Sequence, residues 1–307
     1  MTRHFLEIEH YSPDELHALL IQAACLKRLY LEGGLDPCLK GKTMAVLFEK
    51  PSLRTRISFE VGMAQLGGAT VYLRPEDMGG LGQREPIRDL MRVLNGYVNA
   101  VVVRTFGHEL LLELAHHARI PVINALTDLA HPCQAMADML TIQEHFGELA
   151  GRKVVFVGDG NNVARSLAWA CMKLGLHFVI ASPEAYALPE DFVSHVQEET
   201  GPGRFSALQD PWEAVREADV VYSDTWTSMG QEKEKEQRIR DFAGYQITRD
   251  LMAATGKKSV VMHCLPAYRG LEITDEVIES PQSIVFAQAE NRLHFQRALL
   301  KYLILTQ

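Results

Sequence analysis

The sequence lacks several features that would place it in a specialised class of protein. It has no excess of basic charge, because 31 lysines and arginines face 39 aspartates and glutamates, giving a formal net charge of −8. Without a basic field, a protein has no long-range attraction for nucleic acid or for an anionic membrane. It also has no apolar run near the roughly 20 residues of a membrane-spanning helix. Any anion site must therefore be built locally, from a few side chains and backbone amides.

Paired cysteines and a leader peptide are also missing. The five cysteines are odd in number and include no C-x-x-C pair, which argues against a disulfide framework or a structural zinc site. The opening residues, "MTRHFLEIEHYSPDE", place acids where a secretory signal needs an apolar core. We therefore expect a cytoplasmic protein with reduced thiols.

The pattern that is present is an alternation of short apolar runs with amphipathic segments, which predicts parallel sheets built from βαβ units. In the first half, the expected strands are "KTMAVLFE", "TVYLR", "NAVVVRT" and "IPVINA". Two helices are expected to begin at Ser12 and near Ser52, and three more are expected at residues 87–97, 109–118 and 133–146. In the second half, the expected strands are "KVVFVGD", "FVIAS", "ADVVYSD", "KSVVMHC" and "SIVFA", and the last helix covers residues 290–305.

We therefore predict an α/β fold of two domains, each a parallel sheet flanked by helices. At 307 residues with 47% hydrophobic content, the chain can bury two cores. The motif "GELAGRK" suggests a boundary between residues 1–146 and 147–287. The C-terminal segment, residues 288–307, is expected to pack back on the first domain. The lysine and glutamate run at residues 231–242 is typical of a solvated helix face.

Polar side chains follow several expected strands of the first domain. In "FEKPSLRTR", Ser52, Arg54 and Thr55 lie where a strand hands over to a helix, and a helix N-terminus at the carboxyl edge of a parallel sheet favours an anion. Arg104 ends the strand "VVVRT". Ser52 could also be a plain helix cap, with Arg54 and Arg56 as surface charges.

His131 and Gln134 follow the next expected strand, in "HPCQAMAD". Alone, His131 is more often a structural histidine, and Gln134 could simply begin a helix. Three strands of one sheet would nevertheless deliver hydroxyls, guanidinium groups, an imidazole and a carboxamide to one edge. This set suits a small phosphorylated molecule that also carries a carbonyl and an amide.

Four motifs together resemble the aspartate/ornithine carbamoyltransferase family: "SLRTR", "HPCQAMAD", "DTWTSMGQE" and "HCLPAYRG". They occur in the expected order over nearly the whole chain, and "SMG" and "HCLP" favour the ornithine branch. The resemblance implies transfer of the carbamoyl group of carbamoyl phosphate to the side-chain amine of L-ornithine, giving L-citrulline and phosphate, as in arginine biosynthesis. It also implies a homotrimer with shared active sites and no metal or organic cofactor.

The resemblance further implies roles for individual residues. The residues that it implies to be catalytic are Arg104, His131, Asp224 and Cys264. Carbamoyl phosphate would be bound by Ser52, the Leu53 backbone, Arg54, Thr55, Arg104, His131, Gln134, Cys264, Leu265 and Arg292. L-ornithine would be bound by Asn162, with Asn161 as the competing choice, and by Asp224, Ser228 and Met229.

One position departs from the family pattern. Many ornithine enzymes carry a glutamine or histidine where Gly80 lies in "DMGGLGQ", and that side chain reaches carbamoyl phosphate from a neighbouring subunit. Gly80 cannot make this contact. Gln83 could replace it if the loop shifts.

Other functions are possible for parts of the pattern. "VVFVGDGNNVARS" contains the G-x-G of a nicotinamide-dependent oxidoreductase, but Val163 occupies the place of the third glycine. A metal hydrolase could use His131, Cys133, His263 and Cys264. Their spacing fits no zinc motif, and strand alternation would place His263 and Cys264 on opposite faces. A scaffold without activity, or a carbamoyltransferase for N-acetylornithine or putrescine, are further alternatives.

Overall fold

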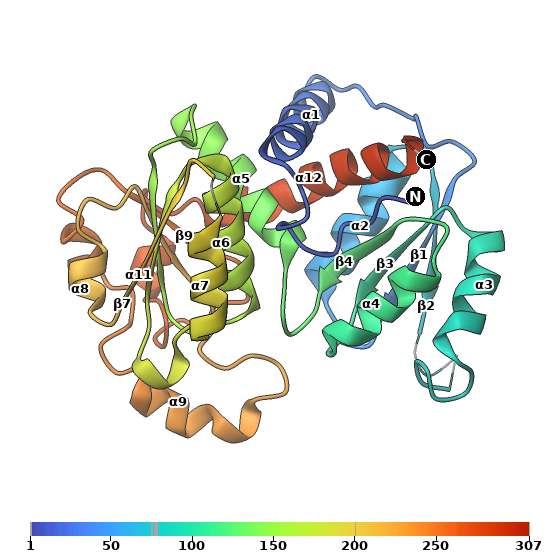
Figure 1. The fold of residues 1–307 in the computed structure, drawn as a ribbon. Coiled ribbons are helices and arrows are strands. Elements are labelled where there is room, and N and C mark those ends of the chain that lie inside the picture. Colours follow the sequence, from blue (N-terminus) through green and yellow to red (C-terminus); the bar gives the residue numbers. More distant parts are fainter. Residues whose placement is uncertain (1, 75, 77–78, 200, 307) are drawn as a thin grey trace. The chain divides into compact units, whose positions relative to one another are not determined.

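The computed structural model describes residues 2–74, 76, 79–199 and 201–306. The chain forms two compact units, Met1–Leu140 with Glu290–Gln307 and, separately, Thr141–Ala289. Both divisions fall inside helices, namely α5 (Pro132–Phe146) and α12 (Val285–Leu305). The chain therefore leaves the first unit once and returns to it at its C-terminal end (Figure 1).

The first unit is built on a four-stranded sheet in the order β2-β1-β3-β4, and every pairing is parallel. The strands match the apolar runs expected from the sequence, and β1, β3 and β4 are buried over nearly their whole length, as in sheets covered on both faces. Their bounds are β1 (Thr43–Phe48), β2 (Ala69–Leu73), β3 (Ala100–Arg104) and β4 (Val122–Leu126).

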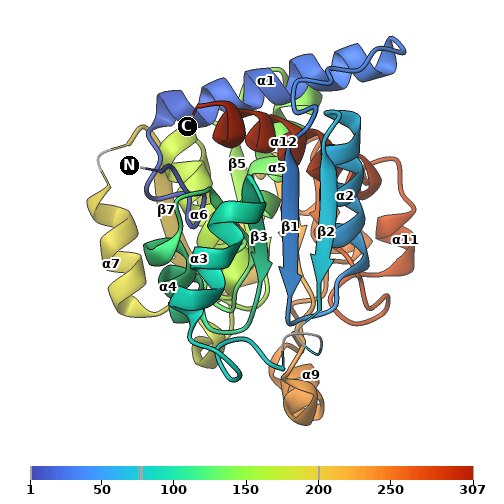
Figure 2. The same cartoon turned by 90° about the vertical axis from the view of Figure 1, so that its right-hand side faces the viewer.

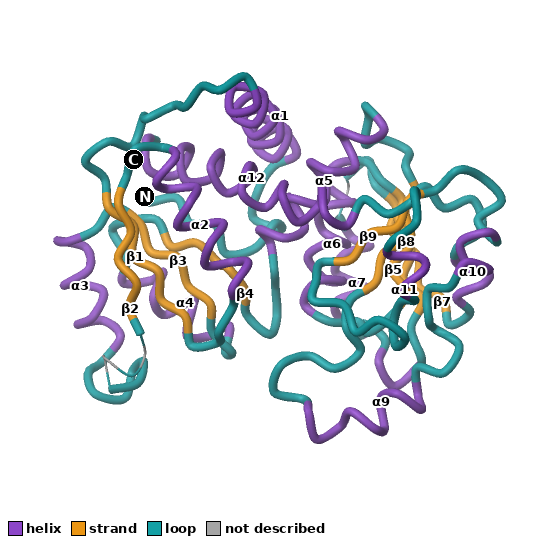
Figure 3. The backbone as a smooth tube through the Cα atoms, turned by 180° about the vertical axis from the view of Figure 1, so that it is seen from behind, coloured by secondary structure: helices purple, strands orange, loops and turns teal. Residues whose placement is uncertain are grey.

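Helices cover both faces of this sheet. On one face, Ala45, Leu47, Val101 and Val103 pack against α3 (Ile87–Tyr97) and α4 (His108–His117). The other face carries α2 (Leu53–Gln65) and the C-terminal part of α12, as Figure 3 shows from behind. Close packing of these two helices brings Leu293 and Arg297 against Gly62. The prediction that the C-terminal helix packs on the first domain is therefore confirmed.

The first helix of the chain, α1 (Pro13–Leu31), begins as its sequence predicts. The Ser12 side chain accepts from the Glu15 amide, and the Glu15 carboxylate accepts from the Ser12 amide, which is the reciprocal pattern of a capping box. Lys27 of α1 donates to Asn291 Oδ1 of α12 at 2.8 Å. In Figure 2, α1 runs beside α12 along the same unit.

The second unit holds a five-stranded parallel sheet in the order β7-β6-β5-β8-β9. Its core on one face joins Val155, Val179, Val221 and Val261 to α8, α10 and α11, while α6 and α7 lie on the other face (Figures 1 and 3). The strands are β5 (Lys153–Val157), β6 (His177–Ala181), β7 (Arg204–Leu208), β8 (Val220–Ser223) and β9 (Val260–His263). The helices are α6 (Asn162–Leu174), α7 (Glu190–Glu198), α8 (Pro211–Ala214), α9 (Lys235–Asp241), α10 (Arg249–Ala253) and α11 (Asp275–Ile278), with 3-10 turns at Glu184–Tyr186 and Glu232–Glu234.

One predicted strand is wrong. "SIVFA" makes only a single bridge, from Ser283 to Val261, and the chain then enters α12, where the Gln288 amide donates to the Ile284 carbonyl at 2.9 Å. Val285 and Gln288 are buried but Phe286 is 59% exposed, which is the spacing of a helix and not of a buried strand. Helix α12 therefore begins before residue 290, where the sequence placed its start.

The strand that the sequence analysis missed is β7, "RFSAL". It pairs only with β6 and lies at the edge of the sheet. Its residues are exposed or half-buried, so it lacks the apolar run by which the other strands were predicted.

The charged run at residues 231–242 is less solvated than predicted. It forms a 3-10 turn and α9, and most of its residues are exposed, but Arg238 and Phe242 are buried. A buried arginine needs partners of opposite charge, so this segment is anchored to the unit and not merely solvated.

Among the described residues, the structure has no helix that is both long and apolar enough to cross a membrane.

Candidate active site

The first part of the candidate site lies in the turn that connects β1 to α2. Ser52 has extended backbone angles and caps α2, with its side chain accepting from the Thr55 amide at 3.4 Å. The Ser52 hydroxyl also donates to Thr55 Oγ1 at 2.9 Å. Arg292, which lies on α12, donates from Nη2 to the same Thr55 oxygen. Residues more than 230 positions apart in the chain thus meet at one helix N-terminus, a place that favours an anion.

Two other predicted residues of this turn are more exposed. Leu53 is the first residue of α2 and is 72% exposed, which leaves its role to the backbone. Arg54, the next residue of α2, is half-buried. By contrast, Arg56 forms an ion pair with Glu60 at 2.8 Å and lies over the Tyr72 ring. Arg56 therefore fits the alternative interpretation, that of a surface charge.

His131 is buried just before α5, close to two arginines. Burial lowers its pKa well below 6.5, and the charges of Arg292 and Arg104 lower that pKa further. The imidazole is therefore neutral near pH 7 and can serve as a hydrogen-bond donor without carrying charge. Gln134, one turn into α5, donates to Asp138 Oδ1 at 2.9 Å.

Lys50 and Asp128 belong to the same sheet edge and were missed from the sequence. Lys50 is buried directly after β1, where its ammonium group forms an ion pair with Asp128 and lies 4.0 Å from the centre of the Phe106 ring. Asp128 follows β4, three residues before His131. The signal was a lysine at a strand exit, "FEK", which the sequence analysis did not consider.

The turn that contains Asp128 has a second attachment. The Thr127 hydroxyl accepts from the Ala130 amide at 3.2 Å and contacts His108 Nδ1 at 2.9 Å. His108 Nε2 in turn lies 3.2 Å from Glu7. The segment that presents His131 is thus fixed by the N-terminal residues on one side and by Lys50 on the other.

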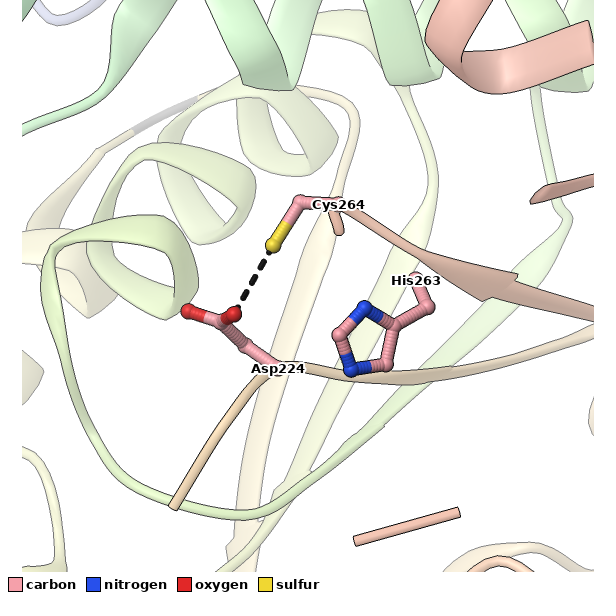
Figure 4. Close-up of side chains that lie close together, drawn as sticks. All are labelled: Asp224, His263 and Cys264. Atoms are coloured by element: carbon pink, nitrogen blue, oxygen red, sulfur yellow. Dashed lines mark hydrogen bonds between the residues drawn. The ribbon is translucent and has the colours of Figure 1, made fainter. Parts of the chain in front are cut away.

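The second part of the candidate site lies at the strand exits of the second unit. Cys264 Sγ donates to Asp224 Oδ1 at 2.9 Å (Figure 4), and the side-chain Nδ2 of Asn161 donates to Asp224 Oδ2 at 2.9 Å. Asp224 follows β8, Cys264 follows β9, and both are buried. The structure thus joins a carboxylate, a thiol and a carboxamide from three neighbouring strands.

The turn between β5 and α6 is already occupied by its own side chains. Asn161 Oδ1 accepts from the Val163 and Ala164 amides at 3.0 and 3.1 Å. A dinucleotide pyrophosphate would need these amides, so the geometry speaks against the oxidoreductase alternative. Asn162, the predicted ornithine contact, is the first residue of α6 and is half-buried.

The prediction that His263 and Cys264 point to opposite faces is wrong. One potential ligand atom each of Asp224, His263 and Cys264 lies within 4.8 Å of the others (Figure 4). Alternation fails because β9 ends at His263 and the next residues form a turn, in which Leu265 has φ 56°. His263 Nε2 contacts Glu272 at 3.1 Å, and its Nδ1 accepts from the Leu265 amide at 2.9 Å. Since both ring nitrogens are engaged, we interpret the group as a hydrogen-bonded cluster.

The remaining predicted residues lie on two loops. Ser228 is half-buried and Met229 is 47% exposed, on the segment after β8; the Ser228 amide donates to Gln231 Oε1 at 3.0 Å. In the first unit, Gly80 has φ 90°, and a Cβ placed on it would lie 2.7 Å from the Gln83 side chain. Gln83 thus fills the space beside Gly80. Asp77 and Met78 of the same motif lie outside the described residues.

Each unit therefore offers a different chemistry. The first gathers guanidinium groups, hydroxyls, helix amides and a neutral imidazole, which suit a small dianion with a polar carbonyl. The second gathers a carboxylate hydrogen-bonded by a thiol and a carboxamide, which suits an ammonium group or an amine.

Two family models match the chain, and together they span nearly all of it. Residues 3–144 match the carbamoyl-P binding domain of aspartate/ornithine carbamoyltransferase, and residues 150–303 match the Asp/Orn binding domain of the same family.

Individual relatives agree with the family models. The chain is 50% identical to an ornithine carbamoyltransferase of Acidothermus cellulolyticus and 47% identical to one of Methanoculleus marisnigri; each alignment covers 99% of this chain and 97% of the relative. Among solved structures, the fold is similar to ornithine carbamoyltransferase from Pyrococcus furiosus, with a TM-score of 0.93, 47% identity and coverage of 97% and 96% of the two chains. It is also similar to the anabolic enzyme from Campylobacter jejuni, with a TM-score of 0.92, 36% identity and full coverage of both chains.

Proposed function

The chain belongs to the aspartate/ornithine carbamoyltransferase family, and from this premise we propose how its residues carry out ornithine carbamoyl transfer. The protein transfers the carbamoyl group of carbamoyl phosphate to the side-chain amine of L-ornithine and releases L-citrulline and phosphate. The amine nitrogen forms a bond to the carbonyl carbon, the bond from that carbon to the phosphate oxygen breaks, and the amine loses a proton.

The first unit binds carbamoyl phosphate. Ser52, Arg54, Thr55 and the amide of Leu53 hold the phosphate at the N-terminus of α2, together with Arg104. Arg292 reaches this place from α12, as its hydrogen bond to Thr55 Oγ1 indicates. Guanidinium groups suit the leaving group because they stabilise the charge that phosphate gains as the bond breaks.

His131 and Gln134 bind the carbamoyl group itself. The neutral imidazole of His131 donates to the carbonyl oxygen, where negative charge develops during attack. Gln134 offers a carboxamide for the carbamoyl nitrogen, which requires it to exchange its present bond to Asp138. The family resemblance also assigns Leu265 and Cys264, which follow β9, to carbamoyl phosphate binding.

The second unit binds L-ornithine. Asp224 pairs with the α-ammonium, Asn162 meets the α-carboxylate, and Ser228 and Met229 cover the amino acid. Cys264 lies beside Asp224 and, with it, orients the side-chain amine and assists its deprotonation. Such assistance matters because an amine with a pKa of about 10.4 is mostly protonated near pH 7.

The observation that carries these assignments is the hydrogen bond from Arg292 to Thr55 at the N-terminus of α2, together with the burial of His131. The direct test is citrulline formation from carbamoyl phosphate with ornithine, N-acetylornithine, putrescine or aspartate as the acceptor. We expect ornithine to react with the highest kcat/KM, because an acceptor without an α-ammonium leaves the buried Asp224 carboxylate without a cationic partner. A higher kcat/KM with putrescine or N-acetylornithine would contradict the role of Asp224.

We further propose that the protein acts as a homotrimer whose active sites lie between subunits. The support is a row of exposed apolar side chains on α2 of the first unit, made by Leu53, Ile57 and Val61. The three α2 residues are four positions apart and so lie on one side of the helix. Gln83, beside Gly80, is the side chain available to reach a neighbouring site.

A further inference from the structure

Arg238 makes an unusual set of contacts for a residue in a charged, exposed segment. Only 7% of its side chain is exposed. Its Nη1 donates to Asp159 Oδ2 at 2.7 Å and to the Trp226 carbonyl oxygen at 3.0 Å, and its Nε donates to Glu234 Oε2 at 2.9 Å. One guanidinium group thus joins α9 to the loop that precedes it and to a turn 79 residues earlier in the chain.

The two loops are those to which the ornithine contacts are assigned. Asp159 lies in the turn after β5, two residues before Asn161, whose side-chain Nδ2 donates to Asp224. Trp226 lies midway between Asp224 and Ser228. Arg238 therefore fixes the spacing between the turn that leads into α6 and the segment that carries Ser228 and Met229.

Aromatic packing holds Arg238 and this segment in one arrangement. The Arg238 guanidinium lies 4.8 Å from the centre of the Tyr186 ring. Trp226 stacks on Phe242 at 5.3 Å with an angle of 13° between the rings, and Phe242 lies 4.7 Å from Tyr186. A planar group held between two carboxylates, a carbonyl and a ring has little rotational freedom, so the loop attached to it is pre-ordered.

We propose that Arg238 is a positioning residue for the amino-acid substrate: it binds no substrate itself, and it pre-orders residues 225–231 against the turn at residues 158–161. The inference rests on the function proposed above. Without this anchor, binding of ornithine would also have to order the loop, and that cost would appear as weaker binding. Carbamoyl phosphate, whose assigned contacts lie mainly in the other unit, would be bound almost as before.

The test compares KM values of Arg238→Met and Arg238→Lys with those of the wild-type protein. We expect Arg238→Met to raise KM for ornithine at least tenfold and to change KM for carbamoyl phosphate less than twofold. Arg238→Lys keeps the charge but loses the planar fork, so its effect should be intermediate. Arg240→Met is the matched control on the same helix, because Arg240 is exposed and donates to Gln237; both KM values should stay within twofold.

Asp159→Asn gives a second, independent variant that keeps the size of the side chain. If Asp159 and Arg238 act as a unit, the double variant should raise KM for ornithine no more than Arg238→Met alone. Equal rises in both KM values, or an unchanged KM for ornithine in Arg238→Met and Asp159→Asn, would overturn the inference while leaving the proposed function intact. A wild-type protein that forms no citrulline would overturn the proposed function and this inference with it.

Discussion

The thiol of Cys264 and the carboxylate of Asp224 form the most direct contact between predicted catalytic residues. Because Sγ donates to Oδ1 at 2.9 Å, the thiol helps to fix the Asp224 carboxylate, to which the proposed mechanism assigns a part in deprotonating the ornithine amine. We predict that Cys264→Ala lowers kcat roughly tenfold to a hundredfold, within the range of general acid and base contributions, and alters the pH dependence of kcat.

The measurement is kcat between pH 6 and pH 10, with Cys264→Ser as the matched control, since serine keeps a donor to Asp224. Circular dichroism and thermal unfolding should show that both variants are folded. A Cys264→Ala protein whose pH–rate profile matches that of the wild type would contradict the role proposed for the thiol.

His131 gives the protein a pH-dependent stability whose sign can be derived. Burial and the charges of Arg292 and Arg104 hold its pKa well below 6.5 in the folded state, whereas the unfolded chain binds a proton below about pH 6.5. The unfolded state then holds more protons, so the free energy of unfolding contributed by His131 is intact above pH 6.5 and falls as the pH drops. The slope approaches about 1.4 kcal/mol per pH unit.

The test is the free energy of unfolding in urea for wild-type protein and His131→Gln between pH 7.5 and pH 5. We expect the wild-type value to fall more steeply with decreasing pH. Other histidines, such as half-buried His4 and buried His294, have lowered pKa values in both proteins, and their contributions cancel in the comparison. Parallel curves would show that His131 titrates normally.

At the scale of the element, the loop between β4 and α5 depends on an ion pair whose two sides differ in burial. The Lys50 side chain is 4% exposed, whereas that of Asp128 is 64% exposed. Asp128→Asn leaves a buried ammonium without a counter-charge and should cost about 3 kcal/mol of unfolding free energy. Lys50→Met leaves a carboxylate that water can solvate and should cost about 1 kcal/mol.

Urea unfolding of both variants and of the double variant distinguishes these cases. Lys173→Met is a suitable comparison, because Lys173 is also largely buried and pairs with Glu199 at 2.9 Å in the other unit. Equal losses of unfolding free energy in Asp128→Asn and Lys50→Met would mean that the difference in burial between the two side chains does not affect stability.

Strands that carry an apolar run in the sequence could be predicted, and the strand without one could not. The strands β1, β3, β4, β5, β6, β8 and β9 follow such runs, while β7 is a polar edge strand and escaped detection. The opposite error occurred at "SIVFA", because a short apolar run fits the start of a buried helix as well as a strand. Helix α1 was predictable from local chemistry, since its capping box needs no tertiary partner.

Side-chain pairs that form only through tertiary contacts could not be predicted from the sequence. Motifs pointed to Ser52, His131 and Asp224, but nothing local indicates that Lys50 meets Asp128 or that Arg238 meets Asp159. These pairs join residues about 80 positions apart, so only the folded chain brings them together. The roles assigned to the individual site residues remain predictions for mutagenesis.

At the scale of the whole molecule, the row of exposed apolar side chains on α2 predicts self-association. Ile57 and Val61 are 49% and 39% exposed. We expect the double variant Ile57→Glu and Val61→Glu to lower the mass measured by size-exclusion chromatography with light scattering from three chains to one. Activity should fall with it if the sites are shared.

The control for this experiment is Val93→Glu, which places the same charge on α3, where Val93 is 48% exposed. A wild-type protein that elutes as a monomer would refute the proposed homotrimer. A double variant that keeps the wild-type mass would show that this face is not the contact between subunits.

The return of the chain to its first unit has a consequence for biosynthesis. Small domains generally fold as they emerge from the ribosome, with the N-terminal one first. Here Arg292 is translated only after the whole of the second unit, so the nascent first unit lacks one residue of the proposed phosphate site until synthesis is almost finished. Polypeptides released early by interrupted translation would consequently lack the hydrogen bond from Arg292 to Thr55.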